Sequence, residues 1–527
     1  MTTGLRATGP GATGATMKRR RFLQMLGAGV ASMGLVGAQS GPSRGAETGS
    51  DGPNVLLITA EDMGPQLSSY GDETISTPHL DRLAESGARF TNAYVTQAVC
   101  SPSRASILTG LHPHQHGQIG LATHRYAMFE EYANIPGLLK QIGYRTGILG
   151  KLHVNPSSVF PFDYVWREGR SISFQHRDVE RIAEVAGDFI ADSAQPFFLM
   201  VNYPDAHLPF IRQDHGLPAE PLGPDDVRAL PALGVDTPRL RGHVANYYNC
   251  IKRLDEGIGL LLAQLTAAGR DGDTLIIFLG DHGPQFSRGK CAVYELALQV
   301  PMIVRWPEAP AGQVRDELVS AIDILPAILD ALGAEAPPAL PGRSLRPLAR
   351  GEQTQWRRYL FAEWNTSHPY PPPTLLFPQR SVRDERYKLI RTLLPDTRSP
   401  IEKYYTSQAL VDTGTTQEEI DAAAPQVRAA YQTWRNPPPE ELYDLAEDPH
   451  EFTNLAEDPQ LAPVRERLSS ELDAWQERTG DALADPEKLQ MLVEENERVS
   501  ARLKETKRRV TELEDFRWGY LDYLREG

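Results

Sequence analysis

The feature that most constrains the fold is a set of short apolar runs that end in acids or histidines. Asn54–Ala60 is followed directly by Glu61 and Asp62, and the run 274–279 is followed by Gly-Asp-His at 280–282. Apolar runs without polar alternation are typical of strands buried on both faces, which occur in parallel sheets. Ligands of such sheets bind beyond the carboxyl ends of the strands, so these polar residues are candidates for a site.

Strand and helix patterns alternate along most of the chain. We expect further strands at 145–150, 196–202 and 301–306, and helices at 78–87, 135–142, 242–268 and 321–332. This alternation predicts an α/β domain over 51–348, with a central, mostly parallel sheet flanked by helices. The Pro-rich segment 334–347 is interpreted as a linker, and a smaller α+β domain with a strand at 381–390 is expected over 349–480.

The C-terminal segment 481–527 is expected to be a charged amphipathic helix. Residues 487–516 contain neither Gly nor Pro, and apolar side chains recur near helical spacing. Such a helix ordinarily packs its apolar face against its own protein. A dimer contact or a lid over the site is the alternative.

The first fifty residues have the pattern of an export signal. Residues 18–23 read Lys-Arg-Arg-Arg-Phe-Leu, an apolar Gly- and Ala-rich stretch follows, and 36–38 offer small residues for cleavage. This order favours a twin-arginine signal over a basic, disordered tail. We therefore expect the twin-arginine export machinery as a partner, a periplasmic or secreted mature protein, and no stable membrane span.

Charge and cysteine content narrow the function classes. The chain has 54 Lys and Arg against 69 Asp and Glu, a net charge of −15, which argues against nucleic acid as a ligand. An anionic substrate would need a local positive pocket. Three cysteines, Cys100, Cys250 and Cys291, are too few and odd in number for a disulfide scaffold.

The most informative string is residues 100–104, Cys-Ser-Pro-Ser-Arg, which continues as Ala-Ser-Ile-Leu-Thr-Gly to residue 110. Cys100 could be a buried structural thiol, which is the usual fate of a free cysteine. It could be a direct thiolate nucleophile, helped by Arg104 and a following helix N-terminus. It could also be the precursor of a modified residue.

The third interpretation is that of a known family. Cys-x-Pro-x-Arg before a helix of small residues resembles the signature of the type I sulfatases, and within these the chain is most similar to the heparan N-sulfatases, or sulfamidases. The supporting strings lie at 77–81, 100–110, 147–153, 159–163 and 441–444. The resemblance implies an alkaline-phosphatase-like fold, one Ca²⁺ or alternatively Mg²⁺, and oxidation of Cys100 to formylglycine by a formylglycine-generating enzyme.

Acids at two strand ends favour a metal site. Hard oxygen ligands after neighbouring strands can hold Ca²⁺ or Mg²⁺, although strand-end acids also cap helices and turns. The resemblance implies that Asp62 and Asp281 are ligands, together with the modified Cys100. Glu61 stands where many sulfatases carry Asp, and His282 where many carry Asn, so both are further candidate ligands.

Four basic residues and Arg104 complete the predicted site. Lys151 and His153 are two residues apart, and in extended chain both side chains would face one ligand. The resemblance implies that Lys151 binds the sulfate and that His153 is the base beside formylglycine. It also implies that His207 contacts the sulfate and the leaving group, that Lys290 binds the sulfate, and that Arg104 stabilises formylglycine. A surface lysine and a core histidine are the alternatives.

Histidines 112, 114 and 116 also suggest a transition-metal site. We prefer a loop in which His114 helps to shape the active site.

The predicted function is hydrolysis of sulfate from a sulfated saccharide, with N-sulfoglucosamine of heparan-type glycans as the expected substrate. By resemblance, hydrated formylglycine attacks sulfur in line while the metal and the basic residues neutralise the sulfate. The alternatives are an O-sulfate ester sulfatase acting on glycans or aryl sulfates, a phosphoester or phosphonate hydrolase of the same superfamily, and a non-catalytic glycan-binding protein.

Overall fold

The computed structural model describes residues 52–167, 172–173, 176–369, 374–395, 397–513 and 515–525. The predicted export signal lies outside these residues. Residues 49–527 form one compact unit. No helix in the described part is long and apolar enough to cross a membrane.

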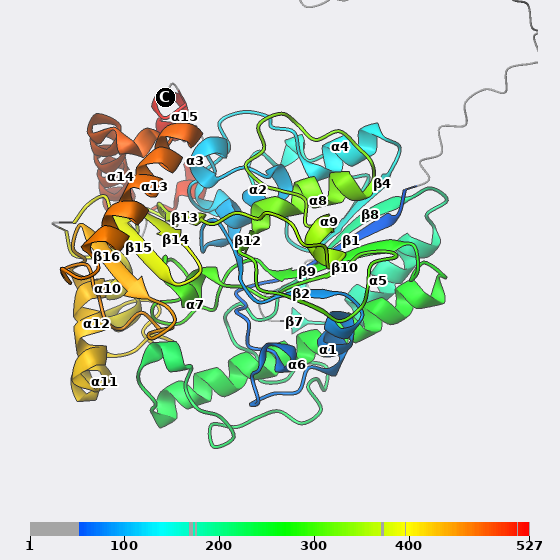
Figure 1. The fold of residues 1–527 in the computed structure, drawn as a ribbon, viewed down its shortest axis with the longest axis horizontal. Helices are drawn as coiled ribbons and strands as arrows, with labels where there is room; N and C mark the ends of the chain where they lie inside the picture. Colours follow the sequence, from blue (N-terminus) through cyan, green and yellow to red (C-terminus); the bar gives the residue numbers. More distant parts are fainter. Residues whose placement is uncertain are drawn as a thin grey trace, which may run out of the picture. The chain divides into compact units, whose positions relative to one another are not determined.

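An eight-stranded sheet forms the centre of the fold (Figure 1). Its strands, in spatial order, are β11 (Gln313–Arg315), β2 (Ala88–Phe90), β10 (Met302–Arg305), β9 (Thr274–Gly280), β1 (Asn54–Ala60), β8 (Phe197–Tyr203), β4 (Arg145–Leu149) and β5 (Tyr164–Trp166). The five strands from β9 to β5 run parallel, whereas β10 is antiparallel to both of its neighbours. The predicted mostly parallel sheet is confirmed, and the carboxyl ends of β1, β4, β8 and β9 lie at one edge.

Both faces of the sheet are covered, as the continuous apolar strands predict. Alternate residues of β1 enter two cores, with Val55 and Leu57 in one and Leu56 and Ile58 in the other. The helices are α1 (Pro78–Glu85), α2 (Cys100–Thr109), α3 (Pro113–His116), α4 (Ile135–Gln141), α5 (Val179–Ala191), α6 (Pro238–Ala267), α7 (Glu295–Leu298), α8 (Ile324–Ala331) and α9 (Arg346–Ala349). Helices α5 and α6 pack against each other over the second core.

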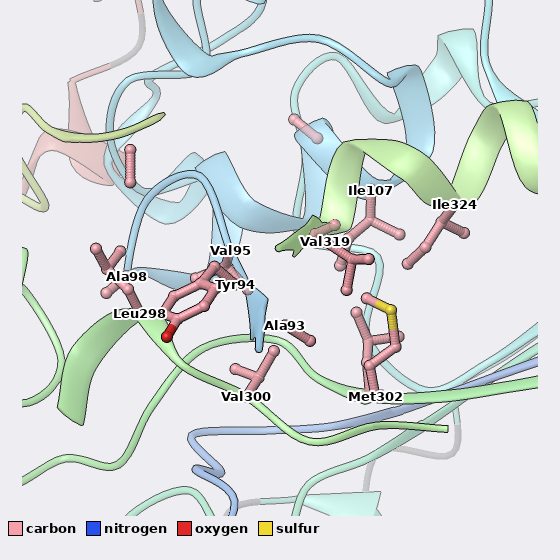
Figure 2. Packing of buried hydrophobic residues seen from close by; sticks show 14 of the residues in the cluster. Ala93, Tyr94, Val95, Ala98, Ile107, Leu298, Val300, Met302, Val319 and Ile324 are labelled. Atoms are coloured by element: carbon pink, nitrogen blue, oxygen red, sulfur yellow. The ribbon is translucent and has the colours of Figure 1, made fainter. Parts of the chain in front are cut away.

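Helix α2 is buried along its whole length. Figure 2 shows its Ile107 beside Val319 and Ile324, with Met302 of β10 close by. Val319 belongs to the short strand β12 (Val319–Ser320), which pairs with β3 (Ala93–Tyr94). A second short ribbon joins β6 (Ile172–Ser173) and β7 (His176–Arg177). Packing on every side fixes the position of α2, and with it the residue at its N-terminus.

A smaller antiparallel sheet follows in the order β13 (Leu360–Trp364), β14 (Gln379–Arg383), β15 (Tyr387–Thr392) and β16 (Glu440–Asp444). Its helices are α10 (Pro400–Ser407), α11 (Gln417–Ala422), α12 (Pro425–Arg435) and α13 (Ala462–Thr479). Side chains of both sheets share one core, which includes Val55 and Trp364. The α+β character is confirmed, and the boundary at 348 and 349 stays a prediction.

Four predicted elements need correction. The strand expected at 381–390 is a hairpin, because Asp384 Oδ1 accepts the backbone N–H groups of Arg386 and Tyr387 and closes a turn. Helix α6 begins before residue 242, because Thr237 caps it and Pro238 suits a first helical position. The helix expected at 321–332 is a 3₁₀ turn at 321–323 followed by α8. Residues 113–116 form a one-turn helix instead of a loop.

The helix in the C-terminal segment is shorter than predicted. Helix α14 spans Pro486–Thr506 and ends where Lys507 adopts a left-handed backbone with φ +53°. A 3₁₀ turn at Val510–Glu512 and the short helix α15 (Tyr520–Tyr523) follow. Leu492 and Trp518 pack with Tyr126 in a common core, so the expectation that this segment covers its own protein is confirmed.

Candidate active site

The parallel strand ends and helix α2 bring the predicted site residues together. Glu61 and Asp62 follow β1, and Asp281 and His282 follow β9, which pairs with β1 in register. The N–H of Asp62 donates to Asp281 Oδ1 at 2.9 Å. Helix α2 is tied to the same edge because the Ser103 hydroxyl donates to the Asp281 carbonyl.

Cys100 begins α2 and lies at the centre of the cluster. Its Sγ is 3.5 Å from His282 Nε2 and 3.6 Å from Lys290 Nζ. Burial raises the pKa of this thiol, but Lys151 and Lys290 outweigh burial and lower its pKa to about 7. Burial raises the pKa of Cys250 and of Cys291 to about 12. Position 100 is therefore the cysteine site that stabilises an anion.

Three ion pairs surround Cys100. Lys290 Nζ donates to both oxygens of Asp62, at 2.8 and 2.9 Å, and Lys151 Nζ donates to Glu61 at 2.6 Å. Arg104 lies 3.0 Å from Asp281. Burial raises the pKa of each carboxyl, but the neighbouring cations outweigh it, so the pKa values of Glu61, Asp62 and Asp281 are lowered. Three carboxylates and three cations thus balance one another.

The arrangement of donor atoms fits a cation. His282 Nδ1 donates to the Gly283 carbonyl at 2.9 Å, which leaves the lone pair of Nε2 facing Asp62 Oδ1 at 3.3 Å. Two acceptors this close require a proton or a cation between them. Burial lowers the pKa of His282, but Asp281 and Asp62 outweigh burial and raise its pKa to about 9, which shows that positive charge is favoured there.

Two groups of potential ligands overlap at Cys100. Glu61, Asp62, Cys100 and His207 form one, and Cys100, Asp281 and His282 form the other, with ligand atoms within 4.8 Å of one another in each. Carboxylate oxygens dominate the set, which suits a hard divalent cation. All five predicted metal ligands are therefore at this place.

Arg104 connects the cluster to β8. Its Nη1 donates to Asn202 Oδ1 at 2.7 Å and to the Lys151 carbonyl at 2.9 Å. The side chain is fully buried and holds Asp281 and the lysine loop in place. Sequence reasoning did not identify Asn202, although its place at the carboxyl end of a predicted strand could have done so.

His207 follows β8 and faces the same carboxylates. Its Nδ1 donates to the Leu208 carbonyl at 2.6 Å, and its Nε2 lies 3.9 Å from Asp62 Oδ2. Burial lowers the pKa of His207, although Asp62 opposes this. The side chain is 18% exposed, so His207 lies at the boundary between the cluster and solvent.

The backbone conformation that places His153 beside the cluster differs from the extended chain that was predicted. Residues 151–153 are not extended, because β4 ends at Leu149 and His153 has a left-handed φ of +55°. His153 Nε2 is 3.4 Å from Thr123 Oγ1, and Nδ1 has no hydrogen-bond partner among the described residues. Burial and nearby Lys151 lower its pKa to about 3, so the imidazole is neutral and can accept a proton.

The histidines at 112, 114 and 116 lie outside the cluster around Cys100. His114 bonds to Glu363 at 2.8 Å and to Thr479 at 2.9 Å, and His116 lies 3.1 Å from Ser106. They do not belong to either group of potential ligands found among the described residues.

Sequence reasoning missed a group of side chains near Lys290. The rings of His124 and His368 are 5.3 Å apart, and His368 is 5.5 Å from Tyr404. Burial lowers the pKa of His124 to about 4 and that of His368 to about 3, with smaller contributions from His153 and Lys290 respectively. These residues come from distant loops, and no local pattern in the sequence identifies them.

Comparison with known proteins identifies the family. A family model described as Sulfatase matches residues 53–334, and one described as N-sulphoglucosamine sulphohydrolase, C-terminal, matches residues 280–399. The chain belongs to the sulfatase family. It is therefore a sulfuric ester or sulfamate hydrolase, with the buried cluster around Cys100 as its candidate active site.

The sulfatase is 35% identical to human N-sulphoglucosamine sulphohydrolase over 465 residues, which covers 81% of this chain and 90% of the human protein. Its fold is similar to that of a phosphonate monoester hydrolase of Agrobacterium radiobacter, with a TM-score of 0.62 and 21% identity over 81% of this chain and 96% of that one. A solved 2-O GAG sulfatase matches equally, with a TM-score of 0.62 and 20% identity over 82% and 93% of the two chains. These two likenesses confirm the alkaline-phosphatase-like fold alone.

Proposed function

We propose that this sulfatase hydrolyses the sulfamate of N-sulfoglucosamine at the end of heparan-type glycans, with formylglycine at position 100 and one divalent cation, Ca²⁺ or alternatively Mg²⁺. The substrate assignment is supported by the human relative, whose name specifies N-sulphoglucosamine, and by the matching C-terminal family model. The O-sulfate ester and phosphonate alternatives remain as outcomes of the test below.

The balance of buried charge carries the catalytic part of the proposal. Three carboxylates and three cations cancel around Cys100, while His282 and Asp62 leave a place for further positive charge. A divalent cation held by Asp62, Asp281 and His282, with Glu61 as a further candidate ligand, would leave two positive charges. The monoanionic sulfo group and a deprotonated nucleophilic hydroxyl together match them.

Each side chain around position 100 then has its own role in the reaction. Formylglycine, hydrated by addition of water to its aldehyde, would supply the nucleophilic hydroxyl, and the cation would neutralise sulfo oxygens. Lys290 and Lys151, which both lower the pKa of the residue at position 100, would bind the remaining oxygens. Arg104 positions Asp281, and neutral His153 accepts a proton.

The leaving nitrogen must be protonated, because an amine anion is a poor leaving group. Burial lowers the pKa of Lys290, but Asp62 outweighs burial and raises the pKa far above its usual value, which suits Lys290 to bind sulfo oxygens as a charged donor. We therefore assign the acid role to His207, which must be doubly protonated to donate from Nε2, because its Nδ1–H is already bonded to the Leu208 carbonyl.

Comparative turnover tests both substrate and acid. Wild-type enzyme should cleave N-sulfoglucosamine faster than glucosamine 6-sulfate. His207→Ala should harm cleavage of N-sulfoglucosamine at least about tenfold more than cleavage of an aryl sulfate, whose leaving phenolate needs less protonation. Lys290→Ala should harm both equally, and His215→Ala, which changes an exposed histidine, should harm neither.

Preference for the 6-sulfated sugar would overturn the N-sulfatase assignment. Preference for phosphonate esters over all sulfates would favour the superfamily alternative. Equal losses on both substrates in His207→Ala would contradict the acid role of His207 but would leave the substrate assignment unaffected.

Export and maturation form a separate part of the proposal. The leader at 1–50 supports passage through the twin-arginine machinery, which carries folded cargo, to the periplasm or outside the cell. Cys100 would be oxidised beforehand by a formylglycine-generating enzyme. Replacement of the arginines at 19–21 with lysines should retain uncleaved precursor inside the cell, which fractionation and immunoblotting would detect.

A further inference from the structure

A cavity lies outside the cluster around Cys100, between β13, the end of α13 and the turn after β12. It has a volume of about 330 Å³, at the lower end of the range for small-molecule sites, about 300–1,000 Å³. Its walls come from the chain before α3, from β12 and the turn after it, from β13, and from the end of α13. The polar and aromatic side chains among its lining residues are His112, Ser320, Arg343, Arg357, Tyr359, Phe361, Trp475, Arg478 and Thr479.

The charge of this cavity is opposite to that of the protein. Three arginines line it and no acid does, although the chain carries a net charge of −15. Asp323, which lies behind the wall, pairs with Arg357. Arg343 and Arg478 are exposed, and neither forms an ion pair with a carboxylate among the described residues. The lining therefore retains positive charge for an anion.

A buried donor in the wall has no partner. Trp475 Nε1–H donates to His112 Nε2 at 3.4 Å, so the proton of the neutral imidazole is on Nδ1. His112 is 4% exposed, and its Nδ1 makes no hydrogen bond to any described residue. The hydroxyl of Ser320, 2% exposed, also has none. Both atoms are shielded from solvent, and buried polar groups are rarely left unpaired, so a small shift of the wall would let the acceptor atoms of a ligand reach them.

Aromatic side chains form another part of the wall. Phe361 and Trp475 are stacked with ring centroids 5.1 Å apart, and Tyr359 lies beside them in the lining. The apolar face of a sugar ring can pack on such side chains, whereas a free inorganic anion gains nothing from them. A sulfo group offers three acceptor oxygens, which suits the arginines and the two unpartnered donors better than a carboxylate.

We propose that this cavity binds a sugar residue that bears a sulfo group, at a site separate from the catalytic one. Cys100 begins α2 and His112 follows the other end of that helix, which is roughly 15 Å long at 1.5 Å per residue, and none of the cavity's lining residues belongs to the cluster around Cys100. The sulfo group bound here is therefore not the one that reacts. The proposal does not depend on which sulfated sugar the active site cleaves.

Isothermal titration calorimetry with glucosamine 6-sulfate tests this. The Cys100→Ala protein, loaded with metal, should bind two molecules, one at each site. Addition of Arg343→Gln and Arg478→Gln, both exposed and therefore tolerant of change, should reduce the stoichiometry to one. Addition of Arg350→Gln, an exposed arginine outside the cavity, should leave it at two. His112→Phe, which keeps a ring but removes the donor, should weaken the second site at least about tenfold.

Unchanged stoichiometry in the double arginine variant would overturn the proposal. Sodium sulfate that binds the second site as tightly as the sugar would overturn the assignment to a saccharide. If the proposed function is wrong and the catalytic site binds no sulfated sugar, the stoichiometry should fall from one to zero, so the two failures are distinguishable. Turnover of a small aryl sulfate should be the same in the double variant with Cys100 intact.

Discussion

This molecule has two buried clusters of oppositely charged side chains, and they differ in how far their side chains are exposed to solvent. Around Cys100, Lys151 and His207 retain 20% and 18% exposure of their side chains. In the cluster between the two sheets, Lys388 pairs with Glu295 and Glu451, each at 2.9 Å, and is 1% exposed. Burial and perturbed pKa values occur in both, so these properties alone do not identify a catalytic site. The accessible edge and the nucleophile position distinguish the first.

The largest expected effect is the loss of activity when residue 100, the nucleophile position, is changed. Cys100→Ala should lower kcat/KM for an aryl sulfate by more than about 1,000-fold, because it removes the nucleophile precursor. The melting temperature should change little, since the thiol makes only long contacts of 3.5 and 3.6 Å. Cys250→Ala should leave turnover of the folded enzyme unchanged, and equal losses in both variants would contradict the assignment.

A matched pair of lysines tests the comparison directly. Lys388→Met leaves Glu451 buried without an ion-pair partner among the described residues and Glu295 with Arg383 alone, which should cost about 3–5 kcal/mol of unfolding free energy. Lys151→Met should cost less, about 1–3 kcal/mol, because Glu61 keeps Arg104 at 3.6 Å and solvent is near.

Activity should show the reverse order. Lys151→Met should lower kcat/KM at least about 100-fold, and folded Lys388→Met should keep it. Urea unfolding and steady-state kinetics on the same preparations give both quantities. The same order in both measurements would break the distinction between a catalytic and a structural cluster.

Acid should weaken the structural cluster in a defined range. Burial raises the pKa of Glu295, but Lys388 and Arg383 outweigh it and lower the pKa from 4.5 to about 2. A lowered folded-state pKa contributes stability above the unfolded value, and this contribution is lost as pH falls from about 4.5 toward 2. Glu295→Gln should therefore flatten unfolding free energy against pH in this range, whereas exposed Glu505→Gln should not. A slope identical to wild type would exclude Glu295 as a source.

The smallest effect concerns the C-terminal segment. Trp518 Nε1–H donates to the carbonyl of His124 at 2.9 Å, and its ring stacks on Tyr126 at 4.5 Å. Trp518→Phe should cost about 1 kcal/mol and raise KM a few-fold, because it loosens the loop that carries Thr123 beside His153. Trp356→Phe loses a comparable bond, to the Leu318 carbonyl, and should cost similar stability without the change in KM. A wild-type KM in Trp518→Phe would show that this contact contributes to stability and not to substrate binding.

The candidate site was largely predictable because its residues follow strands. Buried parallel strands have a strong local signal, and their carboxyl ends meet at one edge, so the acids after β1 and β9 could be brought together in advance. The motif at 100–104 also assigned the start of helix α2 to the predicted site. His124, His368 and Tyr404 come from separate loops, and their proximity depends on tertiary packing that no local pattern contains.

The errors in the fold have local causes. The strand expected at 381–390 ignored Asp384, whose side chain closes a turn by accepting two backbone N–H groups. The helix expected to reach residue 516 relied on the absence of Gly and Pro, yet it ends before Lys507 in a left-handed conformation. Lysine has no strong preference for that conformation, so the sequence offered little warning.

The mass of the peptide that contains Cys100, from active enzyme made in its natural host, tests the central claim most directly. Replacement of CH₂–SH by CHO should lower the mass by roughly 18 units relative to the unmodified peptide. The modified fraction should rise in proportion to specific activity across preparations. Fully active enzyme in which residue 100 carries only an intact thiol would contradict the account.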